Sequence, residues 1–387
     1  MSKVIVELSE LCDVITKGTT PSNIGAEFTE KGIKYIRSEM LTSAKYISDE
    51  GLLYISEETH KKLKRSQLKP GDIIFSMAGV YLGKTAILRE CDTPANTNQA
   101  VALIRIIDEK CNREYVYYYL NLPEVVKSVN SITGQSAQPN INLKQIGNIQ
   151  IMLPERSVQD AVVTILSTYD SLIANNQKQI KLLEEAAQRL YKEWFVDLRF
   201  PGHETTPIVD GVPEGWKKVE VGTCIAKVAR TKQVMTAELL EVGKIPVVDQ
   251  SRNFIAGYTN DEETVVDLGI PIIVFGDHTR VLKYIQFPFA KGADGTQLIV
   301  TTNEKMPQSL FYCSLVNVDL SNYHYARHFK YLKAEEILLP SLDVAHQFDG
   351  VVSPLFEQVQ KLRDKCKLAA EARDRLLPKL MSGEIEV

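Results

Sequence analysis

The sequence predicts a mixed α/β fold in which two α/β domains are separated by two long, antiparallel coiled-coil helices, as an internal repeat with pseudo-twofold symmetry. The first observation is a helix-forming block that occurs twice, 186 residues apart and without a gap, so that Leu153-Pro154 recurs as Leu339-Pro340. The second is the heptad spacing of apolar residues within each copy. The third is that each copy closes a non-helical segment of different length and composition. A duplicated scaffold with two diverged globular parts suggests a molecule that reads two different things at a fixed separation.

Each predicted helix carries apolar residues at the three- and four-residue spacing of a coiled-coil seam. The central helix is expected over residues 155–198 and the C-terminal helix over residues 341–387. Since only two long helices are predicted, they are expected to pack on each other in antiparallel orientation. Asn176 falls on the seam, where it is interpreted as a polar group that sets the register. Ser353 and Pro354 predict a kink or a fresh start early in the second helix.

The segments before these helices read as short strands and turns with some helix. They predict two globular domains, here called heads, of which the first spans residues 1–154 and the second residues 213–340. A linker rich in Pro, Gly and Thr is expected at 199–212. VELSELCDVI in the first head resembles VEVGTCIAKV in the second at an offset of 213. A second resemblance lies in the middle of the heads, where GDIIF and NTNQAV of the first correspond to GIPIIVF and DGTQLIV of the second at an offset near 198. In this alignment Gln99 matches Gln297. The offset falls to 186 at the helices, so the heads have diverged while the helices have kept their register.

The composition is that of an ordinary soluble protein, with 387 residues of which 44% are hydrophobic and 24% charged. No run reaches the roughly 18 apolar residues that span a membrane, and the N-terminus lacks the pattern of a signal peptide. Six cysteines lie far apart without a C-x-x-C pair, which favours a reducing cytoplasm over a disulfide framework or structural zinc. The net charge of −4 excludes DNA binding through a global positive field. Any DNA contact must therefore be local or shared with a partner.

No catalytic motif is recognised in the sequence. GVYLGKT at Gly79–Thr85 has three residues between its glycine and the GK pair, whereas a P-loop needs four, so a turn between two strands is expected. A G-x-S-x-G elbow, a glycine-rich cofactor loop and the tetrapeptide of amino-methyltransferases are missing from the sequence. His324 and His328 have no cysteine or carboxylate at metal-ligand spacing. The sequence therefore predicts a chain that binds and does not react.

Local basic clusters provide candidate DNA contacts. THKKLKRSQLK at Thr59–Lys69 contains five lysines and arginines and no acidic residue, and it reads equally well as a solvated charged face. SNYHYARHFKYLK at Ser321–Lys333 interleaves cations with aromatic residues, which favours nucleic-acid contact because cations bind phosphates or guanine edges while aromatic rings pack on sugars and thymine methyl groups. HTR at His278–Arg280 and KGADGT at Lys291–Thr296 are loop segments that can place donors in a groove.

Several of these segments are similar to those of the specificity subunits of type I restriction–modification systems. They are the C-terminal RDRLLPKLMSGEIEV, the central QIKLLEEAAQRLYKEWF, the VPEGW entry to the second head, and the segments TGQSAQPNIN to IQIMLP and YARHFKYLK to ILLP that close the two heads. The resemblance extends over essentially the whole chain, and the repeat architecture matches independently of any motif.

The resemblance implies a non-catalytic DNA-recognition subunit in the cytoplasm, with two target-recognition domains that each read one half of an asymmetric, bipartite site. It implies double-stranded DNA, two modification (methyltransferase) subunits and restriction (translocase and nuclease) subunits as partners, and no membrane. S-adenosylmethionine, ATP and Mg are expected on those partners and no cofactor on this chain. Helices of about 40 residues at about 1.5 Å per residue limit the separation of the heads to about 60 Å, which corresponds to half-sites about one turn of DNA apart or somewhat more.

Candidate site residues are named on residue chemistry. Arg37, Arg280 and Arg327 are predicted base readers, because arginine binds guanine bidentately, and the lysines are predicted phosphate contacts. The predicted DNA-binding residues are Thr19, Thr20, Arg37, Lys61, Lys64, Arg65, Gln135, Ser136, Gln138, His278, Arg280, Lys291, Tyr323, His324, Tyr325, Arg327 and His328. The predicted partner-binding residues, which read equally well as helix-to-helix core, are Leu182, Tyr191, Trp194, Phe195, Leu376, Leu377 and Leu380.

Two other classes of function remain open at this point. A single-chain DNA-modifying enzyme would bind a cofactor or a metal by itself. A coiled-coil adaptor whose heads bind protein would show no sequence-selective DNA binding, even together with its partners.

Overall fold

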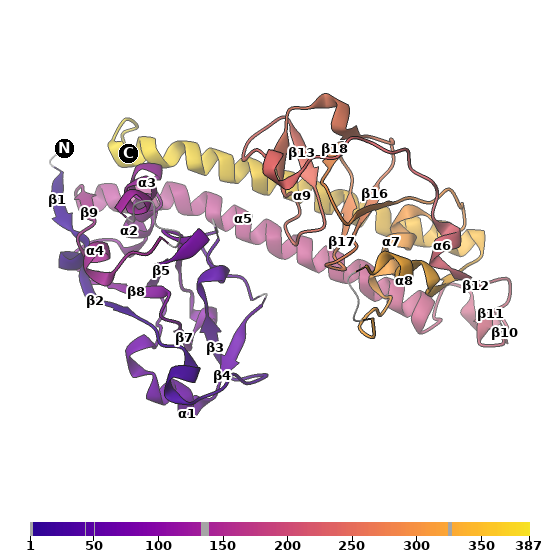
Figure 1. The fold of residues 1–387 in the computed structure, drawn as a ribbon, viewed down its shortest axis with the longest axis horizontal. Coiled ribbons are helices and arrows are strands. Elements are labelled where there is room, and N and C mark those ends of the chain that lie inside the picture. The colour runs from indigo at the N-terminus through magenta and orange to yellow at the C-terminus, as the bar shows by residue number, and fades with distance from the viewer. Residues whose placement is uncertain (1–2, 43, 50, 133–138, 324–326) are drawn as a thin grey trace. The chain divides into compact units, whose positions relative to one another are not determined.

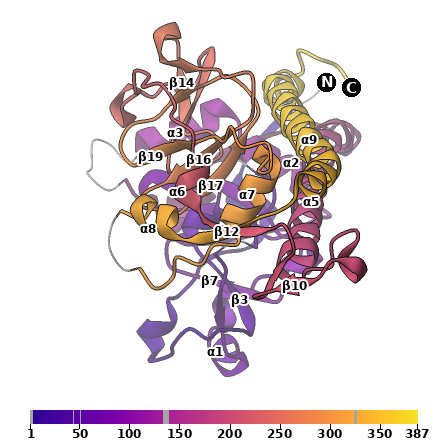
Figure 2. The same ribbon diagram turned by 90° about the vertical axis from the view of Figure 1, so that its right-hand side faces the viewer.

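The computed structural model describes residues 3–42, 44–49, 51–132, 139–323 and 327–387. The predicted mixed α/β class is confirmed (Figure 1). The chain divides into two compact units, of which unit 1 comprises Met1–Ala174 with Lys367–Val387, and unit 2 comprises Asn175–Cys366. Each of the two long helices contributes one end to each unit, so each unit contains a head and a stretch of the antiparallel helix pair (Figures 1 and 2).

The two long helices lie where the heptad spacing predicts them. Helix α5 spans Arg156–Tyr191 and continues as a π-helical turn over Lys192–Val196, and helix α9 spans Leu342–Ser382. Within unit 1, Asp170 of α5 faces Arg373 of α9. Within unit 2, Glu184 of α5 faces Arg363 of α9. Because residue numbers rise along one helix where they fall along the other, the helices are antiparallel, as predicted.

The predicted fresh start of a helix at Pro354 is wrong, since α9 runs through this residue. Proline removes one helical hydrogen bond and crowds the preceding turn, but packing of the same segment offsets this cost. Phe348, Val352 and Phe356 are all buried in the core of unit 2. Ser353 does not cap a new helix, because its hydroxyl donates to Asp349 Oδ1 at 2.6 Å.

The polar seam residue Asn176 is buried, with 3% of its surface exposed, and lies beside Cys366 of α9 in unit 2. This placement agrees with its interpretation as a group that sets the register.

The head in unit 1 contains three sheets, with strand orders β1-β9, β2-β8-β5-β6 and β4-β3-β7. The described residues of this head also form four short α-helices. The strands are β1 Val4–Glu7, β2 Cys12–Lys17, β3 Ile33–Ile36, β4 Leu53–Ile55, β5 Ile73–Ser76, β6 Thr85–Ile87, β7 Ala95–Thr97, β8 Val101–Ile106 and β9 Gln150–Leu153. The helices are α1 Glu57–Lys62, α2 Arg113–Leu120, α3 Pro123–Ile132 and α4 Leu143–Gly147. Helix α2 ends before Pro123, and α3 starts on it.

The head in unit 2 repeats this plan with strand orders β12-β20, β17-β16-β19 and β14-β13-β18-β15. The predicted linker contains strand β10 Ile208–Val209, which pairs with β11 Val212–Pro213. The other strands are β12 Lys217–Glu220, β13 Ile245–Val248, β14 Gly257–Thr259, β15 Val265–Val266, β16 Ile272–Gly276, β17 Leu282–Ile285, β18 Phe289–Lys291, β19 Thr296–Ile299 and β20 Glu336–Leu339. The helices are α6 Val221–Cys224, α7 Gln308–Val316 and α8 Phe329–Ala334.

The strand pairing supports the repeat that the sequence predicts. In β1-β9, Val6 pairs with Ile151, and in β12-β20, Val219 pairs with Ile337, so the two ladders are offset by 213 residues at the entry and 186 at the exit of each head. The match of Gln99 with Gln297 is wrong, because Gln99 precedes β8 whereas Gln297 lies inside β19. A single shared letter is weak information where the loops of two heads differ in length.

A buried polar network joins the head of unit 1 to the helix pair. The carboxylate of Asp170, which is 4% exposed, accepts hydrogen bonds from Arg373 Nη1 at 2.6 Å and from the Tyr118 hydroxyl. Lys45 Nζ donates to Glu114 Oε2 at 2.7 Å and to the Tyr118 oxygen at 3.0 Å. Burial, followed by the charge of Asp170, raises the pKa of Tyr118. The phenol therefore stays protonated and donates to Asp170.

We expect Asp170→Ala to reduce the free energy of unfolding by about 3–5 kcal/mol, because it removes the buried carboxylate that accepts from Arg373 and leaves that guanidinium with the exposed Asp374 alone. Chemical denaturation followed by circular dichroism measures this loss. Glu185→Ala is the control, since its ion pair with Lys181 on the exposed side of α5 spans 3.9 Å and is expected to contribute about 0.5 kcal/mol or less. Equal losses in the two variants would contradict the importance of the network.

Candidate nucleic-acid interface

In each head, a turn joins two neighbouring strands of one sheet. Backbone hydrogen bonds tie this turn to the segment that precedes the last strand of the head, which is β9 in unit 1 and β20 in unit 2. In unit 1, the β5–β6 turn is held by Gly79 N, which donates to Pro139 O at 3.0 Å, and by Met77 O, which accepts from Ile141 N at 3.0 Å. In unit 2, the backbone of the β16–β17 turn accepts at Asp277 O from His328 N at 2.8 Å. The two turns therefore occupy equivalent places in the two heads.

A threonine turn lies beside the first of these sites. A Cβ atom at Gly18 would lie 1.9 Å from Thr97 O, so only glycine allows this close approach of the two backbones. The Thr20 hydroxyl donates to Gln99 Oε1, and Arg65 Nη2 lies 3.5 Å from Thr19 Oγ1. The structure thus brings Thr19, Thr20 and Arg65 together, although they are separated in sequence.

A hollow of 520 Å³ adjoins this turn, and Gln99 lines it. Half of the residues that line it are polar, two of these are lysines, and none of the lining residues is acidic. Its lining residues are Lys17, Met77, Ala78, Gln99, Ala100, Asn140, Ile141, Asn142, Leu143 and Lys144. Amide groups and cations in this arrangement match the edges of bases and the phosphates of a nucleic acid.

The remaining predicted residues of the first head differ in accessibility. Lys61 and Lys64 are exposed and have their charges free to approach phosphate. Arg37 is half-buried, pairs with Glu39 at 2.8 Å, and holds a buried Nε without a hydrogen-bond partner among the described residues. Arg37 is therefore partly committed to its own head, which reduces its freedom to read a base.

Arg280 of the second head is held in a defined position. Its backbone is left-handed, with φ of 60°, which is uncommon outside glycine. Its Nε donates to His328 Nε2 at 3.2 Å and its Nη2 donates to Tyr323 O at 2.7 Å. These two contacts orient the arginine before any ligand binds.

His328 supports Arg280 from inside the head. Only 4% of its surface is exposed, so it does not form part of an accessible face in this structure. Burial and then the charge of Arg280 lower its pKa, against the opposing effect of Asp277. The neutral ring is the form that accepts the hydrogen bond from Arg280.

His278 and Thr279 form the exposed part of the second turn. His278 N donates to Gln250 Oε1 at 3.1 Å, and the Thr279 hydroxyl donates to Gln250 O at 2.5 Å. A Cβ atom at Gly295 would lie 2.7 Å from both Gln250 Oε1 and His278 Cδ2, so glycine is required for this packing. Lys291, which is half-buried with a pKa lowered by burial, ends the neighbouring strand β18.

The described residues of the segment Ser321–Lys333, which mixes aromatic and basic side chains, are partly engaged within the head and partly exposed. Tyr323 stacks on Tyr331 with ring centroids 4.2 Å apart, and its hydroxyl donates to Glu335 Oε1 at 2.9 Å. Tyr323 is therefore engaged within the head, whereas Arg327 is exposed. Five predicted DNA-binding residues lie outside the described residues: Gln135, Ser136, Gln138, His324 and Tyr325.

Two features escaped prediction from the sequence. Gln250 follows strand β13 as an ordinary polar loop residue, and nothing in its sequence context indicates that it supports His278. The β5–β6 turn was interpreted only as a connection, yet its Val80 is 88% exposed, and Lys84 Nζ lies 5.4 Å from the centre of the Tyr81 ring. The sequence feature that could have indicated an exposed contact here is Val80, an apolar residue that lies between glycines in the turn.

The predicted partner-binding residues are mostly core. Tyr191 and Phe195 are buried in unit 2, and Leu377 and Leu380 are buried in unit 1. Trp194 and Leu376 are half-buried. Leu182 is 54% exposed on α5, so it is the member of the set that is most available to another protein.

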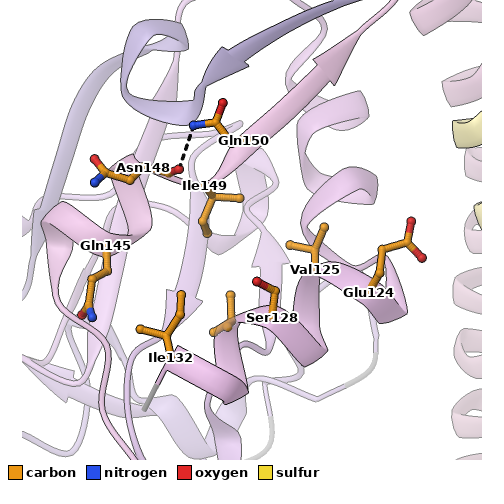
Figure 3. Close-up of a pocket in the computed structure, with 9 residues that line it drawn as sticks. Glu124, Val125, Ser128, Ile132, Gln145, Asn148, Ile149 and Gln150 are labelled. Atoms are coloured by element: carbon orange, nitrogen blue, oxygen red, sulfur yellow. Dashed lines mark hydrogen bonds between the residues drawn. The ribbon is translucent and has the colours of Figure 1, made fainter. Parts of the chain in front are cut away.

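A second hollow in unit 1, of 390 Å³, lies between α3, α4 and β9 (Figure 3). Val125, Ile132 and Ile149 line its apolar centre, and Gln150 at its rim donates to Asn148 O at 3.2 Å. Glu124 is its charged lining residue, so this hollow offers no cation to a phosphate and does not extend the basic surface.

The described residues also bear on metal binding and on insertion into a membrane. Among them, no group of three or more His, Cys, Asp and Glu side chains is placed to hold a metal ion. The helices within the same ranges include none that is long and apolar enough to cross a membrane.

Known proteins resemble this chain in sequence and in fold. Residues 2–185 match the family described as the type I restriction modification DNA specificity domain. The chain is 26% identical over 405 residues to the type I restriction enzyme MjaIX specificity subunit of Methanocaldococcus jannaschii, covering 96% of this chain and 91% of that protein. It is 21% identical over 178 residues to the HindI specificity subunit of Haemophilus influenzae, covering 45% of this chain and 38% of that one. The S subunit of the type I restriction-modification system from M. genitalium has the same fold, with a TM-score of 0.55 at 15% identity over 98% of this chain and 96% of that chain.

We expect His328 to make the stability of the second head pH-dependent. Its folded-state pKa lies below the ordinary value, so the unfolded chain binds the proton more readily and stability is lost as the pH falls below about 6.5. Thermal unfolding at about pH 7 and pH 5 measures this effect against His328→Gln, which cannot titrate. The variant should show a smaller decrease in melting temperature, and an identical decrease would assign the pH dependence to other groups.

Proposed function

We propose that this chain, which belongs to the type I restriction–modification specificity proteins, reads an asymmetric, bipartite DNA sequence with one head on each half-site. The observation that carries the proposal is the equivalent turn of the two heads, fixed in the same way but built from different residues. Equivalent scaffolds place the two turns alike, whereas different side chains bind different bases. Identical heads would instead read a palindrome.

The charges of the two candidate surfaces support DNA as the ligand. The first head offers Lys61, Lys64 and Arg65 in exposed positions, and the second offers Arg327 and a pre-oriented Arg280. Arginine can read guanine bidentately, and lysine can neutralise phosphate. Since the net charge is −4, part of the phosphate neutralisation is assigned to partner subunits.

The proposed partners are two modification (methyltransferase) subunits and the restriction (translocase and nuclease) subunits of the same system. In this proposal the chain itself carries no catalytic residue, and S-adenosylmethionine, ATP and Mg bind to those subunits. The relatives are named as specificity subunits, which supports this division. Binding of S-adenosylmethionine by the isolated chain would instead favour a single-chain modifying enzyme.

Mapping of methylated adenines tests the proposal. The chain is co-expressed with its modification subunit, and host DNA is sequenced with detection of modified bases. A bipartite, asymmetric motif that disappears when this chain is deleted is the expected result. An unchanged methylation pattern would place specificity in another protein and favour the adaptor function.

We expect Arg327→Ala and Arg65→Ala to relax specificity in opposite half-sites. Each change should cost about 1–3 kcal/mol of binding free energy at the bases that its head reads, and leave discrimination in the other half-site intact. Binding of the complex to the mapped duplex and to single-mismatch duplexes measures this. Uniform weakening on all sequences would identify the residue as a phosphate contact.

We expect Leu182→Glu to weaken co-purification of the modification subunit. The side chain is 54% exposed, so the free energy of unfolding should change by only about 0.5 kcal/mol, while a charge placed in an apolar interface opposes binding. Pull-down with tagged chain gives the measurement. Glu185→Ala is the matched control on the same helix, and unchanged capture in Leu182→Glu would exclude this face as the docking surface.

A further inference from the structure

Lys283 occupies a place in strand β17 that the alternation of side chains reserves for an apolar residue. It pairs across the sheet with Val274, and the alternate residue Ile285 lies with Val274 in one hydrophobic cluster of unit 2. Only 4% of Lys283 is exposed. Burying an ammonium group is costly unless its hydrogens are satisfied, so its retention here indicates a specific role.

The ammonium group closes the loop that follows β13. Its Nζ donates to Asp249 O at 2.8 Å and to Asn253 O, two carbonyls at opposite ends of a short segment. The Asp249 carboxylate lies 3.8 Å from Nζ and also accepts from Ser251 N at 2.9 Å. One cation therefore fixes both ends and the first side chain of loop 249–253.

The same loop supports the reading turn of the second head. Gln250, inside the loop, accepts at Oε1 from His278 N and at its carbonyl from the Thr279 hydroxyl. A Cβ atom at Gly276 would lie 3.0 Å from Gln250 Cβ, so turn and loop are in direct contact. A movement of the loop would move His278 and Thr279, which precede Arg280.

We propose that Lys283 is a positioning residue for sequence recognition by the second head, which it supports by clamping loop 249–253 beneath the turn that carries His278 and Arg280. This inference rests on the proposed function of the chain as a DNA reader. Lys283 does not contact DNA, since it lies inside the head, and its effect on specificity passes through Gln250.

The protonation of Lys283 separates this role from a purely structural one. Burial lowers its pKa to about 8, and Asp249 opposes that shift. Among the described residues, Asp249 is the charged group that acts on this pKa, and Val274, which pairs with Lys283 across the sheet, is apolar.

Two properties then change in opposite directions as the pH rises above about 8. Stability rises, because the unfolded lysine holds its proton up to about pH 10.4 while the folded one has released it. The clamp weakens, because a neutral amine makes weaker hydrogen bonds and loses its attraction to Asp249.

The test uses the full chain in complex with its modification subunit, and duplexes that carry the mapped motif or single mismatches in one half. The half-site of the second head is the one in which Arg327→Ala relaxes specificity. For Lys283→Met, whose side chain is also unbranched but one atom shorter and uncharged, we expect discrimination in that half-site to fall about tenfold and discrimination in the other to persist. Wild-type discrimination in the same half-site should decrease between pH 7 and 9, and that of Lys283→Met should not.

Lys45→Met is the matched control, because it removes a buried lysine from unit 1; it should lower stability without changing discrimination by the second head. Retained discrimination in Lys283→Met, or equal loss in both half-sites, would overturn the inference. If Lys283→Met does not fold, the wild-type pH profile decides, and a discrimination that is constant from pH 7 to 9 would overturn it. If the wild-type complex discriminates in neither half-site at any pH, the proposed function itself is wrong. This result differs from failure of the inference about Lys283, which concerns the half-site of the second head alone.

Discussion

The paired charges between α5 and α9 determine the register on which each unit is built. Asp170 meets Arg373 in unit 1, and Glu184 meets Arg363 in unit 2. A shift of either helix would leave the buried Asp170 of unit 1 without Arg373, at a cost larger than a surface ion pair could recover, and would also separate the partly exposed Glu184 and Arg363 of unit 2. Apolar heptads alone tolerate such shifts, because one leucine contact resembles the next. In unit 1 the same charges also reach the head, since Tyr118 of α2 donates to Asp170.

Each head preserves its connection to this helix pair and varies in what it exposes. The entry and exit strands, β1-β9 and β12-β20, keep equivalent residues in register. The difference in length between the heads is absorbed in loops, which can change without loss of the core. The turn between the central strands differs in sequence, but its backbone is tied to the chain just before the closing strand in both cases. Specificity can therefore change by substitution in the turns while the supporting hydrogen bonds remain.

The helices and strands of the scaffold could be predicted because they depend on local sequence patterns. Much of the candidate site could not be predicted, because it depends on contacts between segments that are distant in the sequence. Heptad spacing located α5 and α9, and the repeat offsets located the ladders, because periodicity is a property of contiguous sequence. Pro354 was misread, since the cost of a proline is local but the packing of Phe348 and Phe356 that offsets it is tertiary. His328 looked like an accessible histidine until its burial beneath Arg280 was seen. Lys283 gave no signal, because its partners are backbone carbonyls that no side-chain pattern reports.

The two heads also differ in how far their cations are organised before DNA binds. Arg280 is oriented by His328 and by the Tyr323 carbonyl, so little side-chain entropy is lost when it forms a bidentate contact. Lys61 and Lys64 are exposed, and fixing such a flexible side chain costs up to about 2 kcal/mol. Mobile cations suit phosphates, which accept from many directions, while a base edge requires a fixed donor geometry. Under the proposed function, we therefore expect the second head to discriminate more sharply per cation and the first head to bind the phosphate backbone more strongly. The base contacts of the first head are then proposed to lie at the threonine turn and in the hollow beside Gln99.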